Sequence, residues 1–205
     1  MKALLIIDMQ NDFMPGGSLP VPQGDKLIPL INDLMKYFPL IVASQDCHPA
    51  DHVSFAKNHP GRYEGEVIEV KGEPQVLWPM HCVVGTHGAE FVSNLNSGSI
   101  DAVFPKGQSK ELDSYSAFFD NAHLQSTGLA DFLKERGVTD VYLTGVATDY
   151  CVLYSALDAL ELGFNVYLIA EASSGVDLQE GASQRAGELI ESKGGHVILS
   201  SEIYS

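Results

Sequence analysis

Short, continuous runs of valine, isoleucine and leucine alternate along this chain with segments of helical periodicity. Strands that lack polar alternation are buried on both faces, which is typical of a parallel sheet covered by helices. The pattern therefore predicts an α/β protein with a mostly parallel central sheet and helices on both of its faces. The expected strands are 2–7, 40–45, 99–105, 140–145, 165–170 and 196–200, and the expected helices are 26–38, 128–138, 149–163 and 178–195.

Residues 46–98 interrupt this alternation with many Pro, Gly, His and Asn residues. The chain of 205 residues has no internal repeat, low-complexity segment or linker, and it is long enough for one domain with a substantial core. We expect a single domain over 1–205 with an irregular insertion at about 46–98. Long irregular stretches are often functional, and open parallel sheets bind ligands beyond the carboxyl ends of their strands.

The formal net charge of −15 argues against nucleic acid or an anionic membrane surface as a partner. The amino-terminal segment 1–12 lacks the features of a signal peptide, and no apolar stretch is long enough to span a bilayer. The cysteines Cys47, Cys82 and Cys151 show neither a disulfide framework nor zinc-finger spacing. We expect a cytoplasmic protein. The sequence does not determine the oligomeric state, and it is compatible with a homo-oligomer.

Ionisable side chains follow several of the expected strands at their carboxyl ends. Asp8 follows the first strand, Lys106 the third, and Cys151 lies in the first turn of the helix after the fourth, with Thr148 or Asp149 as its cap. The dipole and free N–H groups of that turn favour a thiolate and can receive an oxyanion. Taken singly, Cys151 is explained by packing, Asp8 by the capping of a loop, and Lys106 by exposure to solvent. Together they can supply a nucleophile, a base and an electrostatic organiser.

A second group of polar side chains follows the strand 40–45. Asp46 and His48 are two residues apart, so their side chains point to the same face of a strand-like segment, and His81 can supply a third ligand. A hydrogen-bonded surface pair would explain Asp46 and His48 equally well, whereas Cys47 is expected to point away and to pack. Two imidazoles and a carboxylate predict one divalent metal ion, with zinc ahead of iron and manganese. Three nearby histidines carry no assignment: His52, His59 and His87.

Aromatic side chains lie in non-helical segments close to these polar groups in the sequence. Phe13, Trp78 and Tyr115 either anchor loops or line a flat slot for a planar small-molecule substrate.

Several segments of the chain resemble the nicotinamidases of the isochorismatase-like cysteine hydrolase family. They match in order from the amino terminus to about residue 175: LLIIDMQNDFMPGGSL, SQDCHPADHVSFAKNHPG, LWPMHCVVGTHGAEF, PKG, DSYSAFFDN and TGVATDYCVLYSALDA. The resemblance implies a Rossmann-like, three-layer α/β/α domain. It also implies an amidohydrolase that converts nicotinamide, and pyrazinamide too, to the acid and ammonia through a cysteine thioester in NAD salvage.

The resemblance also implies roles for the residues already singled out. The catalytic positions match Asp8, Lys106 and Cys151, the ligands of a metal that binds the pyridine nitrogen match Asp46, His48 and His81, and the substrate-binding positions match Phe13, Trp78 and Tyr115. The pair Val146–Ala147 matches a cis peptide that shapes an oxyanion hole from the N–H groups of Ala147 and Cys151. The chain departs from the family at Cys47, where an aromatic residue is common.

Three other interpretations remain open at this point. The chain could be a metallohydrolase in which metal-bound water attacks directly and Cys151 only packs. It could be a related cysteine amidohydrolase that acts on another small amide. It could also be a non-catalytic protein that binds a small molecule on the same fold.

Overall fold

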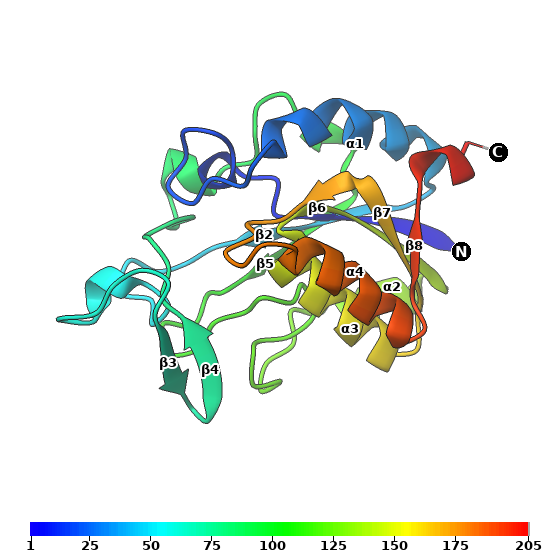
Figure 1. Cartoon of the computed structure of the whole chain (residues 1–205). Helices are drawn as coiled ribbons and strands as arrows, with labels where there is room; N and C mark the ends of the chain where they lie inside the picture. Colours follow the sequence, from blue (N-terminus) through cyan, green and yellow to red (C-terminus); the bar gives the residue numbers. More distant parts are fainter. Residues whose placement is uncertain (205) are drawn as a thin grey trace.

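A six-stranded parallel sheet forms the middle of the molecule (Figure 1). The computed structural model describes residues 1–204. The strand order is β5–β2–β1–β6–β7–β8, and every neighbouring pair is parallel, which confirms the predicted sheet. The strands are β1 (Lys2–Ile7), β2 (Ile41–Asp46), β5 (Ala102–Lys106), β6 (Asp140–Val146), β7 (Asn165–Ser174) and β8 (His196–Ile198).

Helices cover both faces of this sheet, so the predicted three-layer architecture is confirmed (Figure 1). Helix α1 (Ile28–Leu34) packs on one face, and α2 (Leu129–Glu135), α3 (Leu153–Glu161) and α4 (Ala182–Ser192) pack on the other. Successive side chains of β1 enter opposite cores, because a strand alternates its side chains between its two faces. Leu4 and Ile6 belong to the core on the α1 side, whereas Leu5 and Ile7 belong to the core on the other side. Within residues 1–204, no helix is long and apolar enough to cross a membrane.

The expected helix at 26–38 is wrong as a continuous element. The chain there forms a 3-10 turn (Gly24–Leu27), then α1, then a second 3-10 turn (Met35–Tyr37). Proline lacks an N–H group and fits an α-helix only in its first turn, so α1 begins beside Pro29.

The stretch expected to be irregular contains a hairpin of two short strands, β3 (Val67–Val70) and β4 (Glu73–Val76), which stands apart from the main sheet (Figure 1). Lys71 and Gly72 at its turn have φ values of 52° and 89°, the left-handed conformation that tight hairpins require. Pro74 lies within the second strand, and Val67 is exposed. Proline disfavours a strand assignment, so the sequence pattern did not reveal this hairpin.

Several element boundaries also differ from the expected ones. Strand β5 starts at Ala102 because 97–99 forms a 3-10 turn, β7 continues to Ser174, and β8 ends at Ile198. Gly145 in β6 has a φ of 106°, and a Cβ there would lie 2.1 Å from the carbonyl oxygen of Ile7. Only glycine allows the close approach of β6 to β1 at the point where the polar side chains gather.

Candidate active site

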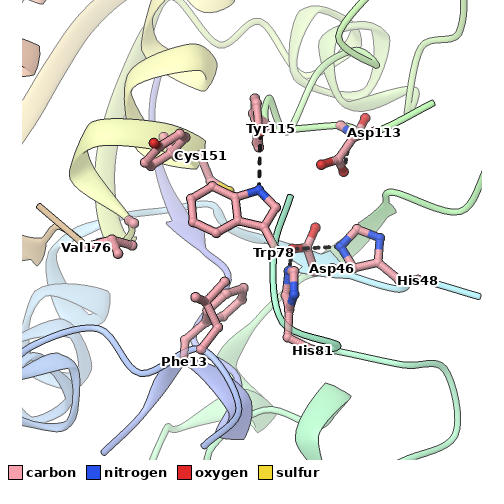
Figure 2. A pocket seen from close by; sticks show the side chains of 13 residues that line it. Phe13, Asp46, His48, Trp78, His81, Asp113, Tyr115, Cys151 and Val176 are labelled. Atoms are coloured by element: carbon pink, nitrogen blue, oxygen red, sulfur yellow. Dashed lines mark hydrogen bonds and ion pairs between the residues drawn. The ribbon is translucent and has the colours of Figure 1, made fainter. Parts of the chain in front are cut away.

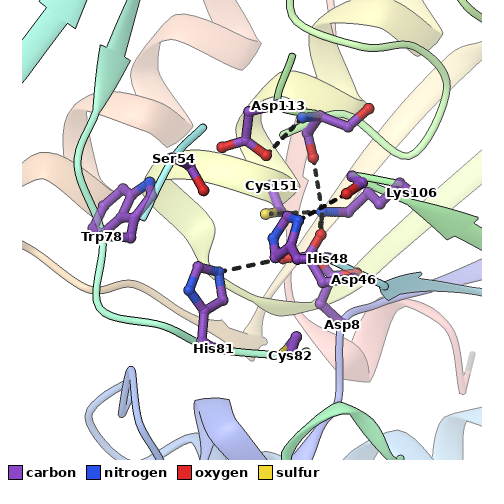
Figure 3. Close-up of polar contacts among 12 residues, drawn as sticks. Asp8, Asp46, His48, Ser54, Trp78, His81, Cys82, Lys106, Asp113 and Cys151 are labelled. Atoms are coloured by element: carbon purple, nitrogen blue, oxygen red, sulfur yellow. Dashed lines mark hydrogen bonds and ion pairs between the residues drawn. The ribbon is translucent and has the colours of Figure 1, made fainter. Parts of the chain in front are cut away.

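Four neighbouring strands bring their carboxyl ends together at one edge of the sheet. Asp8 directly follows β1, Asp46 ends β2, Lys106 ends β5, and Cys151 lies in the turn after β6. Because β5, β2, β1 and β6 are adjacent in the sheet, the side chains meet in one buried cluster (Figure 3). Residues that are up to 143 positions apart in the sequence (151 − 8) therefore share a site, as we expected from the parallel topology.

Lys106 lies at the centre of this cluster. Its Nζ is 2.9 Å from Asp8 Oδ2, 2.5 Å from Asp46 Oδ1 and 3.4 Å from Cys151 Sγ, and it donates to the carbonyl oxygen of Ser114 at 3.0 Å. The side chain is fully buried. A solvated lysine is therefore excluded, and the ammonium group is stabilised by two carboxylates in place of water.

Burial governs the proton affinities of the groups around Lys106. Burial raises the pKa of the Asp8 carboxyl, although Lys106 and a 2.7 Å hydrogen bond from Ser44 Oγ act in the opposite direction. Burial disfavours ionisation of Asp46 as well, but Lys106 and His48 hold the pKa of that carboxyl well below its usual value. The two carboxylates thus differ: Asp46 is held as an anion, and Asp8 is adapted to accept a proton.

The Cys151 thiol does not have the lowered pKa that we expected. Burial raises the pKa of the thiol well above its usual value, and Lys106 opposes that effect. The Asp8 carboxylate lies beside the thiol, within 4.8 Å of the Cys151 sulfur. Removal of the thiol proton therefore depends on this adjacent carboxylate more than on the helix dipole.

The turn that carries Cys151 is a π-helical turn, Thr148–Val152, that runs directly into α3. No side chain caps it, so the expected cap at Thr148 or Asp149 is wrong. The Asp149 carboxylate instead accepts hydrogen bonds from the N–H groups of Val176 and Asp177 at 2.9 Å and 2.8 Å. The Val146–Ala147 peptide bond is cis, as the resemblance implied.

Asp46, His48 and His81 form a compact group whose donor atoms lie within 4.8 Å of one another. Asp46 Oδ2 is 3.3 Å from His48 Nε2 and 3.7 Å from His81 Nε2, and all three residues are buried, which excludes a surface pair. The other ring nitrogen of each histidine contacts a backbone carbonyl: His48 Nδ1 lies 2.9 Å from Gly107 O, and His81 Nδ1 lies 2.8 Å from Pro79 O. Such contacts place the proton on Nδ1 and leave Nε2 free to bind a metal. The group fits a divalent metal ion.

Asp46, His48 and His81 line a pocket that Cys151 also lines (Figure 2). The three aromatic residues singled out in the sequence, Phe13, Trp78 and Tyr115, all line it. Trp78 Nε1 donates to the Tyr115 hydroxyl at 3.2 Å, which fixes the two rings relative to each other. The pocket is thus bounded by aromatic rings, with the thiol and the candidate metal ligands in its walls, a suitable shape for a planar ring.

Sequence reasoning missed several residues of this pocket. The additional lining residues are Leu19, Asp113, Ser114, Tyr150 and Val176. The Tyr150 ring lies 4.9 Å from Trp78 and 5.4 Å from Tyr115, centroid to centroid. These three rings together form one wall of the pocket, which we call the aromatic wall. Its position directly before Cys151 was the available signal, but the phase of an irregular helical turn cannot be read from a sequence pattern.

Two polar residues of the first motif, Gln10 and Asp12, were also missed. The Gln10 amide donates to Asp46 O and accepts from Asp46 N, both at 2.8 Å, so it fixes the backbone of a candidate metal ligand. Asp12 accepts from the N–H of Cys82 at 2.7 Å, next to His81. These two side chains orient the candidate metal site without belonging to it.

Comparison with known proteins defines the class of protein to which this fold and site correspond. The isochorismatase domain model matches residues 2–202, and the chain belongs to the isochorismatase family. Within that family, the chain is 46% identical over 184 residues to the nicotinamidase of Acinetobacter baylyi, a match that covers 90% of this chain and 86% of the relative. The predicted resemblance to nicotinamidases is confirmed.

Solved structures of the same kind superpose closely on this chain. A nicotinamidase and pyrazinamidase from Acinetobacter baumanii has a TM-score of 0.95 and 44% identity, and the match covers 98% of this chain and 97% of that one. Yeast nicotinamidase bound to the inhibitor nicotinaldehyde has a TM-score of 0.92 and 31% identity, with 98% and 100% covered. A pyrazinamidase from Pyrococcus horikoshii in complex with zinc has a TM-score of 0.78 and 40% identity, with 97% and 98% covered.

Proposed function

We propose that this chain is a nicotinamidase, an amidohydrolase that converts nicotinamide to nicotinate and ammonia and also accepts pyrazinamide. The observation that carries the proposal is the buried cluster of Asp8, Lys106 and Cys151, in which Cys151 lines an aromatic pocket that two histidines and an aspartate also line. The first group can carry out acyl transfer, and the second can orient a ring nitrogen. The nicotinamidases among its relatives support the same function.

In the proposed mechanism, Asp8 takes the proton of the Cys151 thiol as the sulfur attacks the carboxamide carbon. The N–H groups of Ala147 and Cys151 hold the oxyanion of the tetrahedral intermediate. Asp8 returns its proton to the departing nitrogen, so ammonia leaves and a thioester remains on Cys151. Water then attacks the thioester while Asp8 accepts a proton from it. The bond from carbon to sulfur breaks, Asp8 returns this proton to the Cys151 sulfur, and the acid is released.

Lys106 supports both steps through its charge. Its ammonium group lies 2.9 Å from Asp8 Oδ2 and 3.4 Å from Cys151 Sγ, so it stabilises negative charge on either atom as the proton moves. We assign it the role of electrostatic organiser, because it remains protonated. Although burial opposes its charge, Asp46 and Asp8 hold the pKa of Lys106 well above its usual value.

Asp46, His48 and His81 would hold the divalent metal ion, which we propose to be zinc. When bound, such an ion acts as a Lewis acid that binds the pyridine nitrogen of the substrate. The chain's own contribution is to orient the ring: Phe13, Trp78 and the neighbouring tyrosines confine its faces, so the carboxamide reaches Cys151. Orientation of this kind turns an encounter into an effectively unimolecular step.

We further propose that the chain forms one catalytic domain that works in the cytoplasm, where it returns nicotinamide to NAD synthesis. Its net charge of −15 supports a small molecule as the partner over nucleic acid or a membrane.

The decisive experiment incubates the purified protein with nicotinamide, with and without prior alkylation of its thiols, and measures ammonia. We expect the untreated protein to release ammonia. Alkylation should abolish this activity, and nicotinamide present during alkylation should protect it. Activity that survives alkylation of Cys151 would support the metal-bound water mechanism. Nicotinamide binding without ammonia release would indicate a binding protein.

Replacement of a candidate metal ligand tests the orienting role of the metal site. We expect His81→Ala to lose bound metal and to lower kcat/KM for nicotinamide by about 100-fold or more, because ring orientation contributes several kcal/mol. The matched control is His87→Ala, since the His87 side chain is 83% exposed and lies outside the pocket. Metal content by mass spectrometry and steady-state kinetics check the prediction. Full activity of His81→Ala after exhaustive chelation would contradict it.

A further inference from the structure

Asp113 and Gln75 form a buried pair that the mechanism above does not use. Their exposed fractions are 3% and 2%, and Gln75 Nε2 donates to Asp113 Oδ2 at 3.0 Å. The other oxygen, Asp113 Oδ1, accepts from the N–H of Ser114 at 2.8 Å and is 3.9 Å from His52 Nε2. A carboxylate is costly to bury without an ammonium or guanidinium partner, so the pair needs a reason to be there.

The pair joins the two segments that supply Trp78 and Tyr115 to the pocket. Gln75 belongs to the β3–β4 hairpin, which leads directly into Trp78 and then His81. Asp113 belongs to the loop that starts after Lys106 and leads into Tyr115. Gln75 is the buried residue of a strand whose neighbours Glu73 and Pro74 are exposed, and its amide makes the hydrogen bonds from this hairpin to Asp113 and Tyr115.

Gln75 also contacts the aromatic wall directly. Its Nε2 lies 3.2 Å from the Tyr115 hydroxyl, and the same hydroxyl oxygen accepts from Trp78 Nε1 at 3.2 Å. The position of the Trp78 ring relative to Tyr115 therefore depends on Gln75. Gln75 Nε2 also donates to the carbonyl oxygen of Val76 at 2.8 Å, so the Asp113 carboxylate and the backbone of the hairpin together fix Gln75.

The other end of Asp113 reaches the nucleophile side of the site. Its Oδ1 holds the N–H of Ser114, and the carbonyl oxygen of Ser114 accepts from Lys106 Nζ at 3.0 Å (Figure 3). Asp113 thus fixes two parts of the site. Its Oδ1 fixes the backbone that positions Lys106, and its Oδ2 fixes the Gln75 amide that positions the aromatic wall.

We propose that Asp113 and Gln75 are positioning residues, and that their hydrogen bond sets the aromatic wall of the pocket at the separation that holds the substrate ring. The inference rests on the proposed function, because it concerns the binding of nicotinamide. Neither side chain takes part in the proton transfers or in bond making. Loss of their hydrogen bond, with Asp113 still holding the N–H of Ser114, therefore weakens the binding of substrate and transition state alike, which raises KM and leaves kcat nearly unchanged.

An exchange of the two side chains tests this link. Gln75→Glu places two carboxylates face to face, and Asp113→Asn places two amides face to face. The double variant Gln75→Glu/Asp113→Asn restores one donor and one acceptor with the donor and acceptor sides reversed, and it has the same net charge as the wild type. The matched control is Glu69→Gln, an exposed position on the same hairpin.

We expect Gln75→Glu to raise KM for nicotinamide about tenfold, the effect of one lost charge-assisted hydrogen bond, with kcat within about threefold of the wild type. The double variant should recover most of the tenfold change in KM but not all of it, because the carboxylate at position 75 cannot donate to the carbonyl oxygen of Val76. An unchanged KM in the folded Gln75→Glu protein would overturn the proposal. So would a double variant as impaired as the worse single one, because the link would then not be the hydrogen bond.

Trp78 provides a readout that does not depend on turnover, because it is the single tryptophan of the chain. We expect its fluorescence emission to shift in Gln75→Glu and to return in the double variant, since Gln75 sets the environment of its partner Tyr115. If the wild type released no ammonia from nicotinamide, the proposed function would fail, and this emission would still test the link. Identical emission in all variants would overturn the inference by itself.

Discussion

Cys151→Ala should lower kcat for nicotinamide by about 10⁴-fold or more, because loss of the nucleophile removes the covalent route altogether. The variant should still bind metal and nicotinamide, since the candidate metal ligands and the rings of Phe13, Trp78 and Tyr115 lie on other segments of the chain. Ammonia release measures the first effect, metal analysis the second, and quenching of Trp78 fluorescence by nicotinamide the third. Acid-quenched wild-type enzyme should carry a nicotinoyl adduct that the variant lacks.

The matched control for this prediction is Cys47→Ala. Cys47 is half-buried, burial raises the pKa of its thiol to about 11, and it does not line the pocket. Because Cys47 lies outside the pocket, its thiol does not reach the substrate carboxamide, and its loss should leave turnover intact. Retained turnover in Cys151→Ala, or a wild-type adduct on Cys47, would exclude the thioester mechanism as written.

The convergence of Asp8, Lys106 and Cys151 could be predicted because it follows from topology. Side chains that follow adjacent parallel strands meet at one edge of the sheet, and the apolar runs mark where each strand ends. The same reasoning placed Asp46 and His48 together, because the two-residue period of an extended chain is a local property.

The properties that could not be predicted depend on packing between distant loops. The raised pKa of Cys151 results from burial, which no local pattern around residue 151 encodes. Gln75 and Asp113 are 38 residues apart, the first in a short strand that the sequence pattern did not reveal and the second in an irregular loop, so nothing in the sequence aligned them. Gln10 likewise acts on Asp46 through a hydrogen bond that exists only because β1 and β2 are neighbours.

Lys106→Met should abolish turnover and also destabilise the fold by about 3–5 kcal/mol at neutral pH, because it leaves two buried carboxylates without their cation. Lys106 lowers the pKa of both Asp8 and Asp46, so its removal raises both pKa values in the folded state. A carboxyl whose folded pKa lies above its unfolded value destabilises the fold once pH rises through that range, and protonation at lower pH removes the cost. The loss of stability relative to the wild type should therefore be largest at neutral pH and shrink as the pH falls.

Urea unfolding at neutral and acidic pH measures this difference, with a chelator present so that metal binding adds nothing to either protein. The control is Lys110→Met, because the Lys110 side chain is 62% exposed and lies 4.0 Å from Asp51 in a surface pair that should contribute within about 0.5 kcal/mol. A destabilisation of Lys106→Met that is the same at every pH would mean that packing of the lysine stem, and not its charge, stabilises the site. Lys106 would then hold Asp8 and Cys151 in place by shape alone, and the electrostatic role assigned to it would be wrong.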